Sequence, residues 1–224
     1  MNTTTWPCLA LSGLVVGSAA RHVAWHLAAE RAHPHPHRPR RASPIRDALS
    51  QPTLVPELLG VAGFVLAGWI GGGDLRVAAL CWLVAFALPA VLVDAAVQRL
   101  PDVLTWPCLA GVVVLSFAEA SANGNTSAGV RAIVTGAVVA GAFLALALFA
   151  GVGVGDVKLA ASLAVVLGYV SWGAVAAGIA AGFCLAGLQA AGALLIQRRG
   201  IAAHIPLGPA LLAGAFLALV LTRR

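Results

Sequence analysis

Long apolar runs alternate with short polar or glycine-rich breaks along almost the whole chain. A helix needs about 20 apolar residues to cross a bilayer, and most of the runs reach that length. The pattern therefore predicts an all-α protein, a polytopic integral membrane bundle of about eight transmembrane helices. The apolar segments lie at residues 6–28, 54–71, 76–97, 103–120, 129–150, 157–171, 173–196 and 204–222.

The sixth of these segments, residues 157–171, is short for a full span and follows a glycine-rich run. Irregular backbone at membrane depth occurs only where protein or a water-lined cavity surrounds it. We therefore expect functional residues at this junction.

The composition supports a membrane protein and leaves no room for a large water-soluble domain. Of 224 residues, 60% are hydrophobic and only 10% are charged, whereas soluble domains contain about 25% charged residues. Most of the basic residues behind the net charge of +6 stand in short connections, where they orient a membrane protein. We therefore expect a lipid bilayer around the chain and no nucleic-acid partner.

The one long hydrophilic stretch, residues 29–53, is rich in arginine, which makes it cytoplasmic by the positive-inside rule. A cytoplasmic loop places the N-terminus of a first transmembrane helix, residues 1–28, on the outside. We expect this helix to be retained, since Met1 to Pro7 lack the basic residue of a signal peptide. The His33–His37 tract alternates with proline, and we interpret it as a solvated linker rather than a metal site. No metal site is predicted, because the cysteines form no CxxC pair.

Two of the eight acidic residues lie where charge is costly in a membrane. Asp94 is near the end of the third segment and Asp156 is at the start of the sixth, at the same predicted depth. Two carboxylates brought together share one proton, and such a pair can activate water and protonate a leaving group. Taken singly, each also has a structural explanation: Asp94 pairs with Arg99, or Asp156 caps the next helix.

The residues around both aspartates resemble the motifs of a known family. Residues 153–159 (GVGDVKL) resemble the GxGDxKL signature of the type IV prepilin peptidases, which are polytopic aspartic proteases. Asp94 followed by residues 100–105 (LPDVLT) is similar to the D-x5-(I/L)PDxLT of that family, and residues 205–209 (IPLGP) resemble the IPFGP before the last helix. The stretches follow the family's order within residues 80–215.

The resemblance implies that Asp94 and Asp156 are the catalytic pair and that no metal or other cofactor is needed. It also implies supporting roles for Gly153 and Gly155, which allow a close approach of backbone. Lys158 is expected either to bias the local field or to anchor the helix end.

Two other polar residues receive structural interpretations. Asp102 follows a proline and is interpreted as a cap that opens the fourth segment, rather than as a group that touches substrate. Thr105 begins the hexapeptide TWPCLA, which also occurs at Thr5, and is expected to be a helix cap beside an early-turn proline.

Longer members of the type IV prepilin peptidase family carry a cytoplasmic domain between the first two helices. This domain has two zinc-binding CxxC pairs and is associated with N-methylation of the product. Residues 29–53 contain no cysteine, so we expect a short form without methyl transfer, with its peptidase domain in residues 54–224. The implied function is leader cleavage of type IV prepilin or pseudopilin substrates, at the cytoplasmic face of the bacterial plasma membrane. The alternatives are a proton- or cation-coupled transporter that uses Asp94 and Asp156, and a non-catalytic scaffold of the pilus or secretion machinery.

Overall fold

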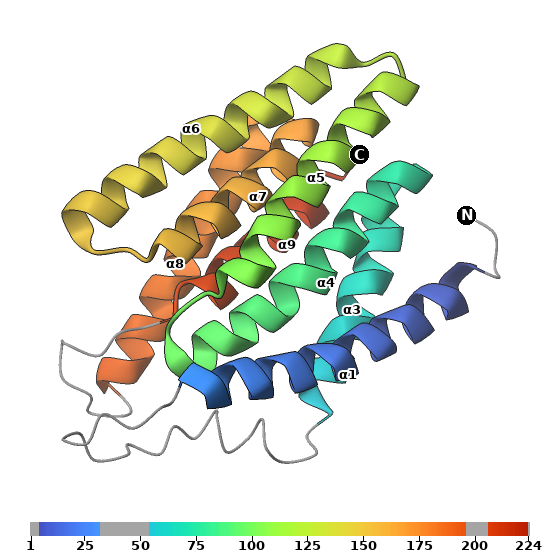
Figure 1. Cartoon of the computed structure of the whole chain (residues 1–224). Helices are drawn as coiled ribbons and strands as arrows, with labels where there is room; N and C mark the ends of the chain where they lie inside the picture. The colour runs from blue at the N-terminus through green and yellow to red at the C-terminus, as the bar shows by residue number, and fades with distance from the viewer. Residues whose placement is uncertain (1–4, 32–53, 196–205, 224) are drawn as a thin grey trace.

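The computed structural model describes residues 5–31, 54–195 and 206–223. Within these ranges the chain is all-helical, as Figure 1 shows, which confirms the predicted all-α fold and its eight helices. The helix ends lie within a few residues of the predicted ones. The helices are α1 (Thr5–Arg31), α3 (Val55–Gly71), α4 (Asp74–Val97), α5 (Asp102–Ala122), α6 (Thr126–Ala150), α7 (Val154–Val170), α8 (Trp172–Leu195) and α9 (Gly208–Leu221).

Five of the helices, α1, α4, α5, α6 and α8, are long and apolar enough to cross a membrane. Helices α3 and α9 are apolar but shorter, and α7 has 17 residues, in line with the short sixth segment of the sequence. Because helices satisfy their own backbone hydrogen bonds, a bundle of this kind is the arrangement of a multi-pass membrane protein.

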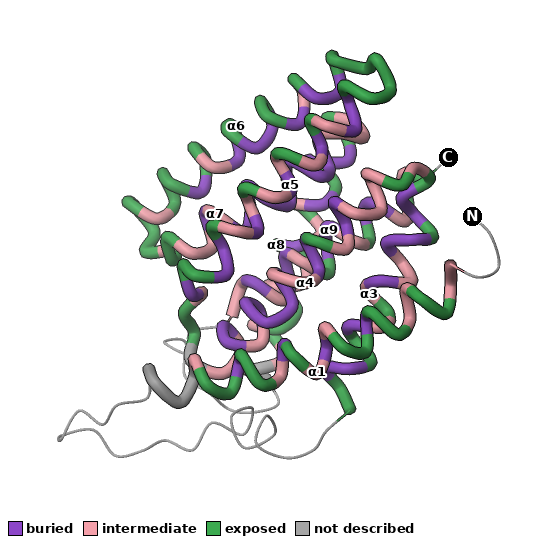
Figure 2. The backbone as a smooth tube through the Cα atoms, turned by 45° about the vertical axis from the view of Figure 1, so that its right-hand side comes forward, coloured by how far each residue is buried: buried purple, intermediate pink, exposed green. Residues whose placement is uncertain are grey.

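Helix α7 lies at the centre of the bundle and packs against α4, α5, α6, α8 and α9. Almost all of its side chains from Val157 to Gly168 are buried, and Leu163 and Leu167 are at most 1% exposed. Outer helices such as α1 and α6 differ from α7, because their outward faces are exposed over much of their length, as Figure 2 shows. Those faces carry large apolar side chains such as Leu11 on α1 and Val138 on α6, which suits contact with lipid.

Helices α1 and α3 form a closely packed pair beside α4. Gly13 and Gly17 of α1 lie directly against the backbone of α3 around Gly60, so that a Cβ atom at any of these positions would overlap the other helix. Arg21 of α1 and Glu57 of α3 form an ion pair with an N–O distance of 3.1 Å. The pairing explains how two charged side chains can lie inside these apolar helices, where an unpaired charge is costly.

The helices run alternately up and down, so the motif residues of the sequence collect at one end of the bundle. The C-terminal end of α4 and the N-terminal ends of α5, α7 and α9 all lie at the lower left in Figure 1. We call this the motif end, because residues 94–105, 153–159 and 206–209 lie there.

At the opposite end, Arg131 of α6 holds the C-terminus of α7. Its Nε atom donates to the carbonyl oxygen of Gly168 at 2.7 Å, and its Nη2 atom donates to those of Tyr169 and Val170 at 2.7 and 3.1 Å. The last carbonyl groups of a helix have no partner within the helix, and a cation near them is favourable. Arg131 therefore fixes the far end of the central helix.

Replacement of Arg131 by methionine is expected to lower the free energy of unfolding by about 2 kcal/mol, because hydrogen bonds to a charged group are lost. Thermal unfolding in detergent, followed by circular dichroism, measures this change. The matched variant Arg99→Met removes an exposed arginine and should leave the midpoint unchanged. Equal midpoints for the two variants would show that the Arg131 contacts contribute nothing.

Candidate active site

Asp94 lies in the last turn of α4, where its side chain is only 4% exposed. Its Oδ2 atom accepts a hydrogen bond of 3.1 Å from the backbone N–H of Gly208, the first residue of α9. A Cβ atom at Gly208 would lie 3.0 Å from the same oxygen, so glycine allows α9 to begin this close to the carboxylate. In the described chain Asp94 thus binds the start of α9, and the predicted pairing with Arg99 is wrong.

Asp156 lies in the first turn of α7, and its backbone N–H donates to the carbonyl oxygen of Gly153 at 3.0 Å. Gly153 occupies the N-cap position, so the interpretation of Asp156 as a helix cap is wrong. The Oδ1 atom of Asp156 is buried and has no hydrogen-bond partner among the described residues. Buried carboxylate oxygens without a partner are rare, and each unmade bond costs about 1–3 kcal/mol.

The start of α9 joins the surroundings of the two carboxylates. Gly208 donates to Asp94, and a Cβ atom at Gly208 would lie 3.5 Å from Cδ2 of Leu159, which is three residues after Asp156 in α7. Neither carboxylate belongs to the two ion pairs of the described chain, Arg21–Glu57 and Lys158–Asp102. The structure thus places the two aspartates that the sequence singled out at the motif end.

Gly155 sets the distance between α7 and the connection from α4 to α5. A Cβ atom at Gly155 would lie 2.5 Å from the Cβ atom of Leu100 and 3.1 Å from its carbonyl oxygen. The connection therefore rests directly on the first turn of α7, and only glycine leaves room for it. Gly153 is in a similar position, because a Cβ atom there would lie 3.1 Å from Oδ2 of Asp156.

Lys158 binds α5 rather than either aspartate of the pair. Its Nζ atom lies 2.5 Å from Oδ1 of Asp102 and 4.8 Å from the centre of the Trp106 ring. The sequence left two roles open for Lys158, and these contacts support the second, in which it anchors the end of the helix. Asp102 is the first residue of α5 and Pro101 occupies the cap position, so the prediction that Asp102 is a cap is wrong.

A double-mutant cycle on Asp102→Asn and Lys158→Met is expected to give a coupling free energy of about 0.5–1 kcal/mol. The value is small because the Asp102 side chain is 68% exposed and water screens the pair. Unfolding midpoints of the two single variants and the double variant measure it. Strictly additive losses would show that the ion pair does not join α5 to α7 energetically.

The model of the type IV leader peptidase family matches residues 81–222. The chain belongs to the type IV leader peptidase family. The predicted membership is thereby confirmed, and with it a peptidase as the general class of protein. Comparisons with curated proteins and with solved structures found no match.

The match to the type IV leader peptidase family covers α4 from Cys81 onward and every helix that follows it. Both aspartates, Gly208 and Leu100 therefore belong to the matched region. Helices α1 and α3 precede it and lie beside the family region through their contacts with α4.

Thr105 is a further residue of the family region whose interpretation from sequence was wrong. Thr105 lies inside α5 and is only 1% exposed, so the prediction that it is a helix cap is wrong. Its hydroxyl group has no hydrogen-bond partner among the described residues. One feature of the sequence could have indicated a buried position. Thr105 belongs to the LPDVLT motif and follows Asp102 by about one helical turn, on a side of α5 that faces the core.

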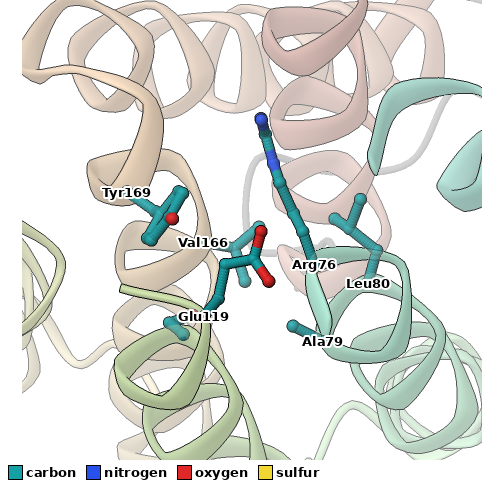
Figure 3. A pocket seen from close by; sticks show the side chains of 7 residues that line it. Arg76, Ala79, Leu80, Glu119, Val166 and Tyr169 are labelled. Carbon is teal, nitrogen blue, oxygen red and sulfur yellow. The ribbon is translucent and has the colours of Figure 1, made fainter. Parts of the chain in front are cut away.

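A polar pocket also lies at the end of the bundle opposite the two aspartates. Figure 3 shows Arg76 of α4, Glu119 of α5 and Tyr169 of α7 around it. The pocket has a volume of about 10 Å³, which is room for about one water molecule. Because the pocket is at the far ends of α4, α5 and α7, it is not part of the candidate active site.

In residues 5–31, 54–195 and 206–223, no group of three or more His, Cys, Asp or Glu side chains is placed to hold a metal ion. Several predictions fall outside these ranges. They concern the His33–His37 tract, most of the basic loop of residues 29–53, and Ile205 of the IPLGP motif.

Proposed function

We propose that the chain is a membrane aspartic endopeptidase that removes the leader of type IV prepilin or pseudopilin substrates. Asp94 and Asp156 are its catalytic pair in this proposal. The supporting observation is the placement of two motif carboxylates at one end of the bundle, in a chain of the leader peptidase family. Neither carboxylate has a basic partner among the described residues. The family match favours this function over the transporter and scaffold alternatives.

The proposed reaction uses one ionised and one protonated carboxyl group. The ionised carboxylate takes a proton from a water molecule while the water oxygen attacks the carbonyl carbon of the scissile peptide. The protonated carboxyl then gives its proton to the peptide nitrogen as the C–N bond breaks. The leader leaves with a new carboxyl terminus, the mature chain has a new amino terminus, and the pair again holds one proton.

The backbone around the pair suits the single negative charge that it carries. Asp94 accepts the N–H of Gly208 at the start of α9, and Asp156 lies in the first turn of α7. Both are helix N-terminal ends, where free N–H groups and the helix dipole favour an anion. The two helices therefore hold both carboxylates in place before substrate arrives.

We place the cleavage at the cytoplasmic face of the membrane. The arginine-rich residues 32–53 connect α1 to α3, and both of those helix ends lie at the motif end. Basic connections stay on the cytoplasmic side, which supports a cytoplasmic site. The apolar segment of the substrate then lies in the membrane beside the enzyme, and its leader remains in the cytoplasm.

Co-expression with a prepilin tests the proposal. We expect wild-type protein to convert the prepilin to a faster-migrating product on a gel, shortened at its N-terminus, whereas cells without the protein keep the full-length form. Unchanged prepilin in the presence of well-expressed protein would contradict the proposal. Ion-dependent uptake by proteoliposomes that contain the protein would support the transporter alternative instead.

A further inference from the structure

The hydroxyl group of Thr105 is buried without a partner, although the fold satisfies a closely similar group elsewhere. Thr105 and Thr135 are both 1% exposed. The Thr135 hydroxyl lies 2.9, 2.9 and 3.0 Å from the carbonyl oxygens of Arg131, Ala132 and Ala164. The Thr105 hydroxyl has no partner among the described residues. Since an unmade buried hydrogen bond costs about 1–3 kcal/mol, the Thr105 hydroxyl calls for an explanation.

Contacts on either side of Thr105 place it opposite the first turns of α7. One turn before it, Asp102 binds Lys158, and one turn after it, the Cys108 thiol interacts with the Ser162 hydroxyl. Residues three apart on a helix share a face, so Thr105 lies on the side of α5 that packs against the start of α7.

The start of α7 is also the position of Asp156. The Thr105 hydroxyl and the Asp156 Oδ1 atom are thus buried polar atoms at the motif end that have no partner among the described residues. A hydroxyl can donate a hydrogen bond, whereas an ionised carboxylate oxygen only accepts. The two groups therefore offer opposite hydrogen-bonding capacities at the same end of α7.

Peptide hydrolysis requires both capacities. The attacking water needs an acceptor for its proton, and the carbonyl oxygen of the peptide needs a donor as it becomes negative. Asp156 and Asp94 supply the acceptor and one exchangeable proton. A donor that stays in place throughout the reaction has to come from another group.

We propose that Thr105 is a further catalytic residue, whose hydroxyl donates a hydrogen bond to the carbonyl oxygen of the scissile peptide. The inference rests on the proposed function, because it assumes that the pair hydrolyses a peptide. The hydroxyl forms no covalent bond and loses no proton. It stabilises the negative oxygen of the tetrahedral intermediate while the carboxyl pair transfers the protons.

Three variants separate this role from a structural one. Thr105→Val removes the hydroxyl and keeps the shape of the side chain, and Thr105→Ser keeps the hydroxyl. Thr135→Val is the matched control, since it removes an equally buried hydroxyl that does have partners. We would measure kcat and KM for leader cleavage of a prepilin by purified protein in lipid vesicles, and the midpoint of thermal unfolding in detergent.

Thr105→Val is expected to lower kcat about 100-fold, with KM changed less than about threefold, because the lost bond forms mainly in the transition state. Its unfolding midpoint should equal or exceed that of wild type, and Thr105→Ser should recover kcat to within about fivefold. Thr135→Val should show the reverse, with a lower midpoint and a normal kcat.

A Thr105→Val protein with wild-type kcat would overturn the inference. So would a Thr105→Ser protein as slow as the valine variant, or a valine variant whose loss of kcat accompanies a lower unfolding midpoint. If Asp94→Asn abolishes cleavage in the same assay while Thr105→Val keeps the wild-type kcat, the role of Thr105 is wrong and the proposed function stands. If Asp94→Asn still cleaves, the proposed function fails, and the inference fails with it.

Discussion

Replacement of either Asp94 or Asp156 by asparagine is expected to lower kcat/KM for leader cleavage by at least about 1,000-fold, and replacement of both should lower it little further. The two carboxyl groups act as one unit in the proposed reaction, so the loss of one leaves the other without its function. Asparagine keeps the size of the side chain but can neither take nor give the proton. Steady-state cleavage by the two single variants and the double variant measures the effect.

The matched control for this prediction is Asp74→Asn. Asp74 is an exposed aspartate at the opposite end of α4, the helix that carries Asp94. We expect this variant to cleave at the wild-type rate. Losses from the two single variants that multiply in the double variant would mean that Asp94 and Asp156 act independently, which contradicts a shared catalytic unit.

Replacement of Gly155 by alanine is expected to lower kcat/KM for cleavage about 100-fold. The new Cβ atom would lie 2.5 Å from the Cβ atom of Leu100, so the start of α7 must move away from the connection between α4 and α5. Asp156 follows Gly155 directly and moves with it, and a displacement of about 1 Å at a catalytic group costs about that factor. The overlap also lowers the free energy of unfolding by about 1–3 kcal/mol.

Gly141→Ala is the matched control for the substitution at Gly155. Gly141 lies within α6, and a Cβ atom there meets nothing within 4 Å. Alanine in this helix interior should raise the free energy of unfolding by about 0.5–1 kcal/mol and leave cleavage unchanged. If Gly155→Ala also cleaves at the wild-type rate, the packing on Leu100 does not position Asp156.

The fold was predictable because the bilayer imposes a simple rule on the sequence. Each spanning helix must be apolar, so polar and glycine-rich breaks mark the ends of helices. The same rule misplaced the start of α7, which we predicted at residue 157, after the charge of Asp156, although the helix begins at Val154. An acidic residue in a first turn is stabilised by the helix dipole, so the charge did not mark the end of the helix.

The placement of Asp94 and Asp156 at one end of the bundle was predictable, because both aspartates stand in motifs that belong to a family. The polar contacts around the two aspartates were not predictable, because each contact joins residues that are far apart in sequence. Gly208 is 114 positions from Asp94, and Asp102 is 56 positions from Lys158. The interpretation of Thr105 as a cap was wrong for a related reason. A threonine two residues before a proline is typical of a helix start, whereas Thr105 lies in the core of the bundle.

A time course of leader release tests the central claim most directly. Purified wild-type protein and the Asp156→Asn variant would be placed in identical lipid vesicles with a prepilin, and the intact mass of the prepilin would be followed by mass spectrometry. We predict that only the wild-type vesicles accumulate a product lighter by the mass of the leader. Accumulation of the same product at the same rate in both sets of vesicles would contradict the account.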